Sequence, residues 1–117
     1  MELADKVTSK PRELFIDGQW VKPAANKYFT TINPATEEGI VEVAQAAEQE
    51  ADLAVAAARR AFDKGPWARM KPTERGKIIF RIAAVVEQQL EELALVESLD
   101  TGKPLSFTRT RDVPFAI

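Results

Sequence analysis

Short apolar runs separated by turn residues characterise the first 45 residues of the chain. Leu14–Ile16 and Trp20–Val21 stand on either side of Asp17-Gly18. Asp-Gly between two apolar runs is the strongest short signal for a β-hairpin, because both central turn residues need positive φ. Residues 28–32 and 40–45 carry β-branched and aromatic runs with turn residues between them, so two further strands are expected after the hairpin.

From Gln49 onward the spacing of apolar positions changes to three and four residues, which indicates a helix. Leu53, Ala57 and Ala61 lie on its apolar face, and the many alanines on that face suit close approach to a neighbouring element. Gly65-Pro66 is expected to end this helix.

A second helix is predicted from Pro72, whose missing N–H costs nothing in a first helical turn. Its apolar stripe is formed by Ile79, Ile82, Val86 and Leu90. Helical character continues to Leu99, and nearly thirty residues would be long for one globular helix, so a break near Gln88-Gln89 is expected. Asp112 before Val-Pro predicts the opening of a further helix, about one turn before the chain ends.

Two absences restrict the chemistry of the chain. Without Cys there is no thiolate zinc site and no cysteine nucleophile, and without His the commonest general base and nitrogen metal ligand are missing. The net charge of −2 and the small size of basic clusters such as Arg109 and Arg111 predict no nucleic-acid partner. Four aromatic residues are interpreted as anchors of strands and a loop to a core rather than as base-stacking residues; they are Trp20, Tyr28, Phe29 and Trp67.

The first five residues, MELAD, lack the basic start and apolar run of a secretory signal. No apolar run reaches the length of a membrane span. The sequence therefore predicts a cytoplasmic protein without a membrane partner.

The stretch ESLDTGKPL, residues 97–105, resembles a phosphate-binding loop only superficially. A phosphate-binding loop needs an upstream Gly and a Ser or Thr after the Lys, whereas Pro104 follows Lys103 here. Gly102 is better interpreted as the left-handed residue that ends a helix. Asp100 then lies at a helix C-terminus, where an acid opposes the dipole, so a cation, a lysine or a nearby N–H is expected to compensate it.

Five blocks of sequence, read in order, resemble the amino-terminal part of the NAD(P)-dependent aldehyde dehydrogenase superfamily. They are LFIDGQWV, INPATEE, RRAFDKGPWARMKPTERGKIIFRIA, VESLDTGKPL and DVPFAI, and the resemblance runs from about Glu13 to Ile117. It implies the N-terminal portion of an α/β fold, in which a hairpin, strands and three or four helices pack on a Rossmann-like domain that is absent here. The implied domain organisation is a flexible arm over residues 1–12 and a truncated part of the cofactor-binding domain over residues 13–117.

Members of the superfamily oxidise aldehydes to acids through attack by a cysteine thiolate, hydride transfer to NAD or NADP, and hydrolysis of the thioester. The residues of the family that carry out this chemistry, and its Gly-rich cofactor turn, match positions beyond Ile117. The resemblance therefore implies no catalytic and no cofactor-binding residue in this chain. It also implies an aldehyde substrate and a homo-oligomer for the intact enzyme.

Two kinds of site residue are carried over from the family. A monovalent cation, sodium or potassium, lies between a backbone carbonyl before the Asn-Pro pair and the Asp of the LDTGKP turn, which places it at Ile32 and Asp100, with Thr31 as a further candidate. Phe115 matches a position at the aldehyde entrance, and its alternative interpretation is an ordinary core aromatic.

The sequence is compatible with three functions. The first is an N-terminal fragment of an aldehyde dehydrogenase that is inactive alone, the second is a stand-alone binding or assembly module, and the third is a small folded domain without a ligand. The first is preferred, because the chain ends on an apolar run and leaves the alanine-rich helix faces without a sheet to cover. The residues do not determine the aldehyde, the choice between NAD and NADP, or the oligomeric state.

Overall fold

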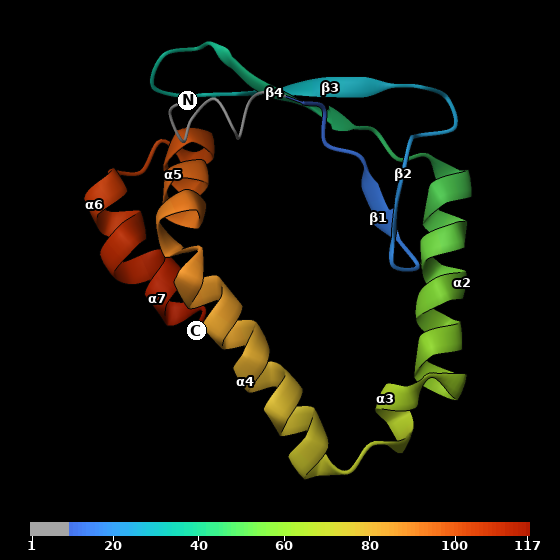
Figure 1. Ribbon diagram of the computed structural model, residues 1–117. Coiled ribbons are helices and arrows are strands. Elements are labelled where there is room, and N and C mark those ends of the chain that lie inside the picture. The colour runs from blue at the N-terminus through green and yellow to red at the C-terminus, as the bar shows by residue number, and fades with distance from the viewer. Residues whose placement is uncertain (1–9) are drawn as a thin grey trace.

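The computed structural model describes residues 10–117, which begin with two separate antiparallel sheets (Figure 1). β1 (Leu14–Ile16) pairs with β2 (Gln19–Val21), and β3 (Tyr28–Ile32) pairs with β4 (Gly39–Ala44). Asp17 and Gly18 have φ angles of 53° and 78°, as a two-residue hairpin turn requires. The predicted hairpin and the two further strands are therefore confirmed.

The last residue of the predicted arm, Arg12, is hydrogen-bonded to a strand. Residues 1–9 of that arm lie outside the described residues. The N–H of Arg12 donates to the Glu42 carbonyl and the N–H of Ala44 donates to the Arg12 carbonyl, both at 2.8 Å. Arg12 thus forms a parallel bridge to β4, because the open edge of β4 offers unpaired backbone groups. The arm prediction is wrong at this residue.

A buried carboxylate connects the strands to the first long helix, α2 (Glu48–Lys64). Glu50, in the first turn of α2, accepts hydrogen bonds from the N–H of Ala24 at 2.7 Å and from the N–H of Ala47 at 2.8 Å. These bonds to the charged form, the Ala24 bond most, lower the pKa of Glu50. The loop after β2 is therefore fixed to the positive end of the helix.

The next three helices are α3 (Pro66–Arg69), α4 (Pro72–Gln88) and α5 (Leu90–Thr101). α4 begins at Pro72 as predicted, and the Glu74 carboxylate accepts the N–H of Lys71 at 2.9 Å. Gln89 separates α4 from α5 with φ −103° and ψ 13°, so the predicted break is confirmed. None of these helices, nor any other within residues 10–117, is long and apolar enough to cross a bilayer.

The last helical stretch begins earlier than the sequence suggests. α6 (Leu105–Phe107), the π-helical segment η1 (Thr108–Asp112) and α7 (Val113–Phe115) follow one another without a gap. Asp112 has helical φ and ψ angles of −60° and −52°, so the prediction that it opens a helix is wrong. The run starts instead after Pro104, whose carbonyl accepts the N–H of Phe107 at 2.8 Å. The side chain of Thr108 is fully buried against α5 and donates to the Ala94 carbonyl at 2.8 Å.

The molecule is an open frame with a small core. Its radius of gyration is 17.1 Å, whereas a compact domain of this length has about 13 Å. Figure 1 shows α2 on one side and α4 with α5 on the other, joined by α3 at one end and by the strands at the other. Among the described residues the buried apolar side chains are Pro23, Ala44, Ala94 and Val113. This chain therefore leaves most of its apolar surface without a covering layer.

Within the described chain the predicted anchoring role is wrong for Trp20, Phe29 and Trp67, whereas Tyr28 is half-buried. Trp20 is 66% exposed and Trp67 is 44% exposed, and Phe29 also lies on the surface. Trp20 contacts Phe15 across the hairpin, with ring centroids 5.0 Å apart. The reason is that the frame encloses too little volume to bury side chains of this size.

Candidate functional site

The end of β3 and the end of α5 meet at one place, which we call the β3–α5 junction (residues 32–34 and 100–102). Gly102 ends α5 with φ 74° and ψ 7°, as the sequence predicts. A Cβ built on Gly102 would lie 2.8 Å from Cγ of Pro34. The INPATEE and LDTGKP blocks, distant in sequence, are therefore in direct contact.

The turn after β3 is held by its own hydrogen bonds. Oδ1 of Asn33 accepts the N–H of Ala35 at 2.9 Å, and the Asn33 carbonyl accepts the N–H of Glu37 at 2.8 Å. The N–H of Asn33 donates in turn to the carbonyl of Glu38 at 2.9 Å. Asn-Pro is suited to this turn because the Asn side chain replaces a backbone acceptor while Pro has a fixed φ. The turn thus presents Pro34 rigidly to Gly102.

Lys103 fixes the other side of the junction to the C-terminal helix. Its Nζ lies 3.2 Å from Oε1 of Glu97 on α5 and 2.6 Å from Oδ2 of Asp112 on η1. Asp112 first, and then Glu97, raise the pKa of Lys103. Ser98 adds a hydrogen bond from its Oγ to the Lys103 carbonyl at 2.7 Å. The chain direction after Gly102 is therefore determined by an ion-pair bridge as well as by the helix cap.

Asp100 lies exposed at this junction and has no hydrogen bond or ion pair to its carboxylate from residues 10–117. The expected compensation by a lysine is not observed there, because Lys103 is committed to Glu97 and Asp112. Ile32 lies on the facing strand, next to the Asn33-Pro34 turn. Each of the two predicted cation positions is thus two residues along the chain from the contact between Pro34 and Gly102. Thr31, the further candidate, directs its hydroxyl to the Val41 carbonyl at 3.4 Å.

Phe115 lies apart from the junction. It is at the far end of the C-terminal helical run from Leu105, and ten residues at the α-helical rise correspond to about 15 Å. Its side chain is 81% exposed. Within the described chain it is therefore not the core aromatic of the alternative interpretation.

The glycines give no cradle for a dinucleotide in the part of the chain that the structure describes. They serve a hairpin turn, a strand, helix ends and a helix interior; they are Gly18, Gly39, Gly65, Gly76 and Gly102. A dinucleotide needs several backbone N–H groups directed at its phosphates from a Gly-rich turn at a helix N-terminus. The described residues therefore do not fit NAD or NADP as a binding site, and no chemical step is assigned to them.

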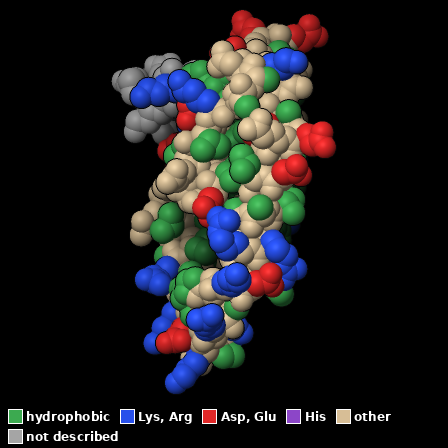
Figure 2. Space-filling model, turned by 90° about the vertical axis from the view of Figure 1, so that its right-hand side faces the viewer, with side chains coloured by type: hydrophobic (Ala, Val, Ile, Leu, Met, Phe, Trp, Pro, Cys, Tyr) green, Lys and Arg blue, Asp and Glu red, His purple; other side chains and the backbone are tan. Residues whose placement is uncertain are grey.

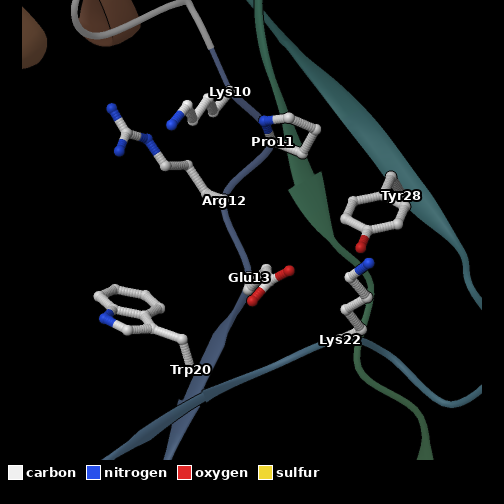
Figure 3. A pocket seen from close by; sticks show the side chains of 7 residues that line it. All are labelled: Lys10, Pro11, Arg12, Glu13, Trp20, Lys22 and Tyr28. Atoms are coloured by element: carbon white, nitrogen blue, oxygen red, sulfur yellow. The ribbon is translucent and has the colours of Figure 1, made fainter.

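A hollow of about 600 Å³ beside the hairpin was not predicted from the sequence (Figure 3). Its walls come from the segment before β1 and from strands β2 and β3, and they combine basic and aromatic side chains. The lining residues are Lys10, Pro11, Arg12, Glu13, Trp20, Lys22 and Tyr28. No local pattern marks this hollow in the sequence, because it forms only where Arg12 bridges to β4 and turns the hairpin beneath it.

Comparison with known proteins identifies the family to which this chain belongs. The model of the aldehyde dehydrogenase family matches residues 20–117, so the chain belongs to the aldehyde dehydrogenase family and is an N-terminal segment of its fold. Betaine aldehyde dehydrogenase of Bacillus subtilis is 49% identical over 92 residues, which are 79% of this chain and 19% of that protein. The Alternaria alternata aldehyde dehydrogenase is 45% identical over 107 residues, 92% of this chain and 21% of its own length.

The solved structures agree with the sequence comparison. The structure of the NAD⁺ complex of an aldehyde dehydrogenase from Bacillus cereus superposes with a TM-score of 0.92 and 38% identity, over 97% of this chain and 23% of that chain. The resemblance and the partial α/β fold predicted from the sequence are therefore confirmed. The chain spans about a fifth of the length of the relatives it matches.

Proposed function

We propose that this chain is part of an NAD-dependent aldehyde dehydrogenase, for which it supplies an outer frame of strands and helices and no catalytic group. The observation that carries the proposal is the superposition of nearly the whole chain on a segment of an enzyme whose solved structure contains NAD⁺. The chain holds neither Cys nor a dinucleotide cradle among its described residues. It is therefore inactive alone, and the cysteine, the cofactor turn and the bound cofactor belong to the remainder of the enzyme.

The intact enzyme oxidises an aldehyde, and we assign it to the cytoplasm as a homo-oligomer. The family supports the aldehyde as substrate, and the uncovered apolar surface of α2 and α4 supports burial against further protein. NAD is preferred to NADP here because the similar Bacillus cereus structure is an NAD⁺ complex. Phe115 borders the aldehyde entrance in this proposal, which its high exposure in the frame permits.

The β3–α5 junction is proposed to contribute to a site for sodium or potassium. The Asp100 carboxylate is exposed and has no partner among residues 10–117, and Ile32 ends the strand that leads into the turn in contact with Gly102. Carboxylate and carbonyl oxygens are the donors that hard cations prefer. No group of three or more acidic, His or Cys ligands exists within residues 10–117, so further oxygens must come from elsewhere in the enzyme. A cation there would also compensate an acid at the negative end of α5.

A chimera tests the proposed function. Residues 10–117 would replace the matching segment of the Bacillus cereus aldehyde dehydrogenase, and NADH formation from an aldehyde would be followed by absorbance. The chimera is expected to turn over, while the isolated chain and a chimera without the recipient's cysteine nucleophile are expected to be inactive. Turnover by the isolated chain, or a folded chimera without activity, would contradict the proposal.

The cation site is tested in the same chimera. Asp100→Asn is expected to remove any difference in melting temperature between sodium chloride, potassium chloride and the chloride of a bulky organic cation. Identical melting of the unsubstituted chimera in all three salts would argue against a bound cation.

The alternative function, a stand-alone binding or assembly module, is supported by the same exposed apolar faces. It predicts that the purified chain is monomeric and melts cooperatively without a partner. The enzyme-segment proposal predicts the opposite, because the few buried apolar side chains among the described residues, Pro23, Ala44, Ala94 and Val113, make a core too small for a chain of this length. Calorimetry and light scattering on the isolated chain distinguish the two.

A further inference from the structure

Positive charge is concentrated in residues 64–81, which we call the basic tip. This segment holds six of the sixteen basic residues of the chain but only one of its eighteen acidic residues, Glu74. The basic residues are Lys64, Arg69, Lys71, Arg75, Lys77 and Arg81. The rest of the chain is therefore strongly acidic, a separation that the overall charge of −2 conceals. Spaced two to five residues apart, these residues do not form a continuous basic run.

Folding brings the basic residues around the α3–α4 connection to one end of the molecule, and Arg81 follows midway along α4. Figure 1 shows the connection between α3 and α4 at an extremity of the frame, and Figure 2 shows Lys and Arg side chains gathered toward that same end. All are exposed except the half-buried Arg75, whose Nη1 donates to the Met70 carbonyl at 2.8 Å. None of the six takes part in a salt bridge within residues 10–117. Their charges are thus available to a partner.

The aromatic side chain of Phe80 lies among these charges, on a face of α4 other than its apolar stripe. Ile79, Ile82 and Val86 form the apolar stripe of α4, and helical geometry places Phe80 roughly 100–160° around the helix from them. Phe80 is 79% exposed. It lines an open hollow of about 710 Å³ together with Lys77 and Arg81. Covering the apolar stripe would therefore leave Phe80 on the outer, basic side of the helix.

We propose that the basic tip binds the surface of an anionic lipid bilayer. Lys and Arg are attracted to acidic headgroups, while exposed aromatic rings such as Trp67 and Phe80 insert at the boundary between headgroups and acyl chains. A projecting end of the frame suits a flat partner, whereas single-stranded nucleic acid is bound in a groove that follows its backbone. The proposal concerns peripheral adsorption, so it is compatible with the absence of a membrane-crossing helix within residues 10–117. It goes beyond the proposed enzymatic function and does not depend on it.

Vesicle sedimentation tests the role of charge. The chimera that carries residues 10–117 is expected to bind vesicles of phosphatidylserine and phosphatidylcholine and to lose that binding in 0.5 M salt or on pure phosphatidylcholine. About 1 kcal/mol per basic residue near an anionic surface corresponds to roughly fivefold in affinity. Lys77→Glu with Arg81→Glu should therefore weaken binding by about 25-fold or more. Lys22→Glu with Lys27→Glu, the same charge change outside the tip, should have a much smaller effect.

Fluorescence tests the role of the aromatic residues. The chain has two tryptophans, and in the chimera the Trp20→Phe variant is compared with the same variant carrying Trp67→Phe, so that the difference between the two spectra reports on Trp67 alone. Its emission should shift to the blue on anionic vesicles, and Phe80→Ala should weaken binding more than Phe29→Ala, another exposed Phe outside the tip. Equal binding to uncharged vesicles, equal effects of the paired variants, or tighter binding to a single-stranded oligonucleotide than to anionic vesicles would each overturn the proposal.

Discussion

Replacing Gly102 by Ala tests whether the β3–α5 junction depends on a residue without a side chain. Gly102 has φ of 74°, and the left-handed conformation at this position costs an L-residue about 1–2 kcal/mol of conformational free energy. The added Cβ would also lie 2.8 Å from Pro34 Cγ, so the proline or the turn must shift, and overpacking of this kind costs about 1–3 kcal/mol. We therefore expect Gly102→Ala to destabilise the fold by about 2–5 kcal/mol.

Gly76 supplies the matched control for this substitution. It lies inside α4, and a Cβ built there meets no atom within 4 Å. Gly76→Ala is expected to stabilise the helix by about 0.5–1 kcal/mol, because alanine loses less backbone entropy than glycine. In the chimera that carries residues 10–117, urea titrations followed by far-ultraviolet circular dichroism should thus move the midpoint in opposite directions for the two substitutions. A Gly102→Ala protein as stable as the parent would refute the argument from the junction.

Three further substitutions test contacts elsewhere in the frame. The pKa of Glu50 is lowered in the fold, so its ionised carboxylate stabilises the fold above the unfolded pKa of about 4.5. This stabilisation is lost as the pH falls through the folded pKa. Glu50→Gln should therefore remove that loss of stability in acid, which the slope of unfolding free energy against pH measures. Thr108→Val should lower the free energy of unfolding by about 1–2 kcal/mol, because the buried hydrogen bond to the Ala94 carbonyl is lost. Thr110→Val, at an exposed position, should lower it by less than about 0.5 kcal/mol, and denaturant titrations measure both. Lys103→Met should speed amide exchange in residues 105–115, since η1 loses its bridge to α5; unchanged exchange would contradict that role.

Local patterns predicted those elements whose signals are contained in a few residues. Asp17-Gly18 specifies its own turn, because positive φ at both positions is a property of that pair. Gly102 ends α5 for the same kind of reason. The separation of α4 from α5 at Gln89 was expected from helix length alone. In each case the decisive free energy lies in the backbone conformation of one or two residues.

The errors arose where a distant segment determines the local conformation. Asp112 has the sequence of a helix start, yet its side chain binds Lys103 and its backbone continues a helix that began at Leu105. Arg12 was assigned to an arm, although the open edge of β4 pairs with it. No pattern within either segment reports the partner, because the partner is brought there only by folding.

The sequence by itself determined the order of strands and helices, the helix stop at Gly102 and the kinship with aldehyde dehydrogenases. Only the tertiary structure decided that Pro34 touches Gly102, that Asp100 stays unpaired while Lys103 bridges Glu97 and Asp112, and that dispersed basic residues share one tip. The physical reason is the range of the interactions. The backbone conformations and hydrogen bonds of turns and helix caps involve a few neighbouring residues, whereas packing, ion pairs and surface charge depend on segments that meet only after the chain has folded.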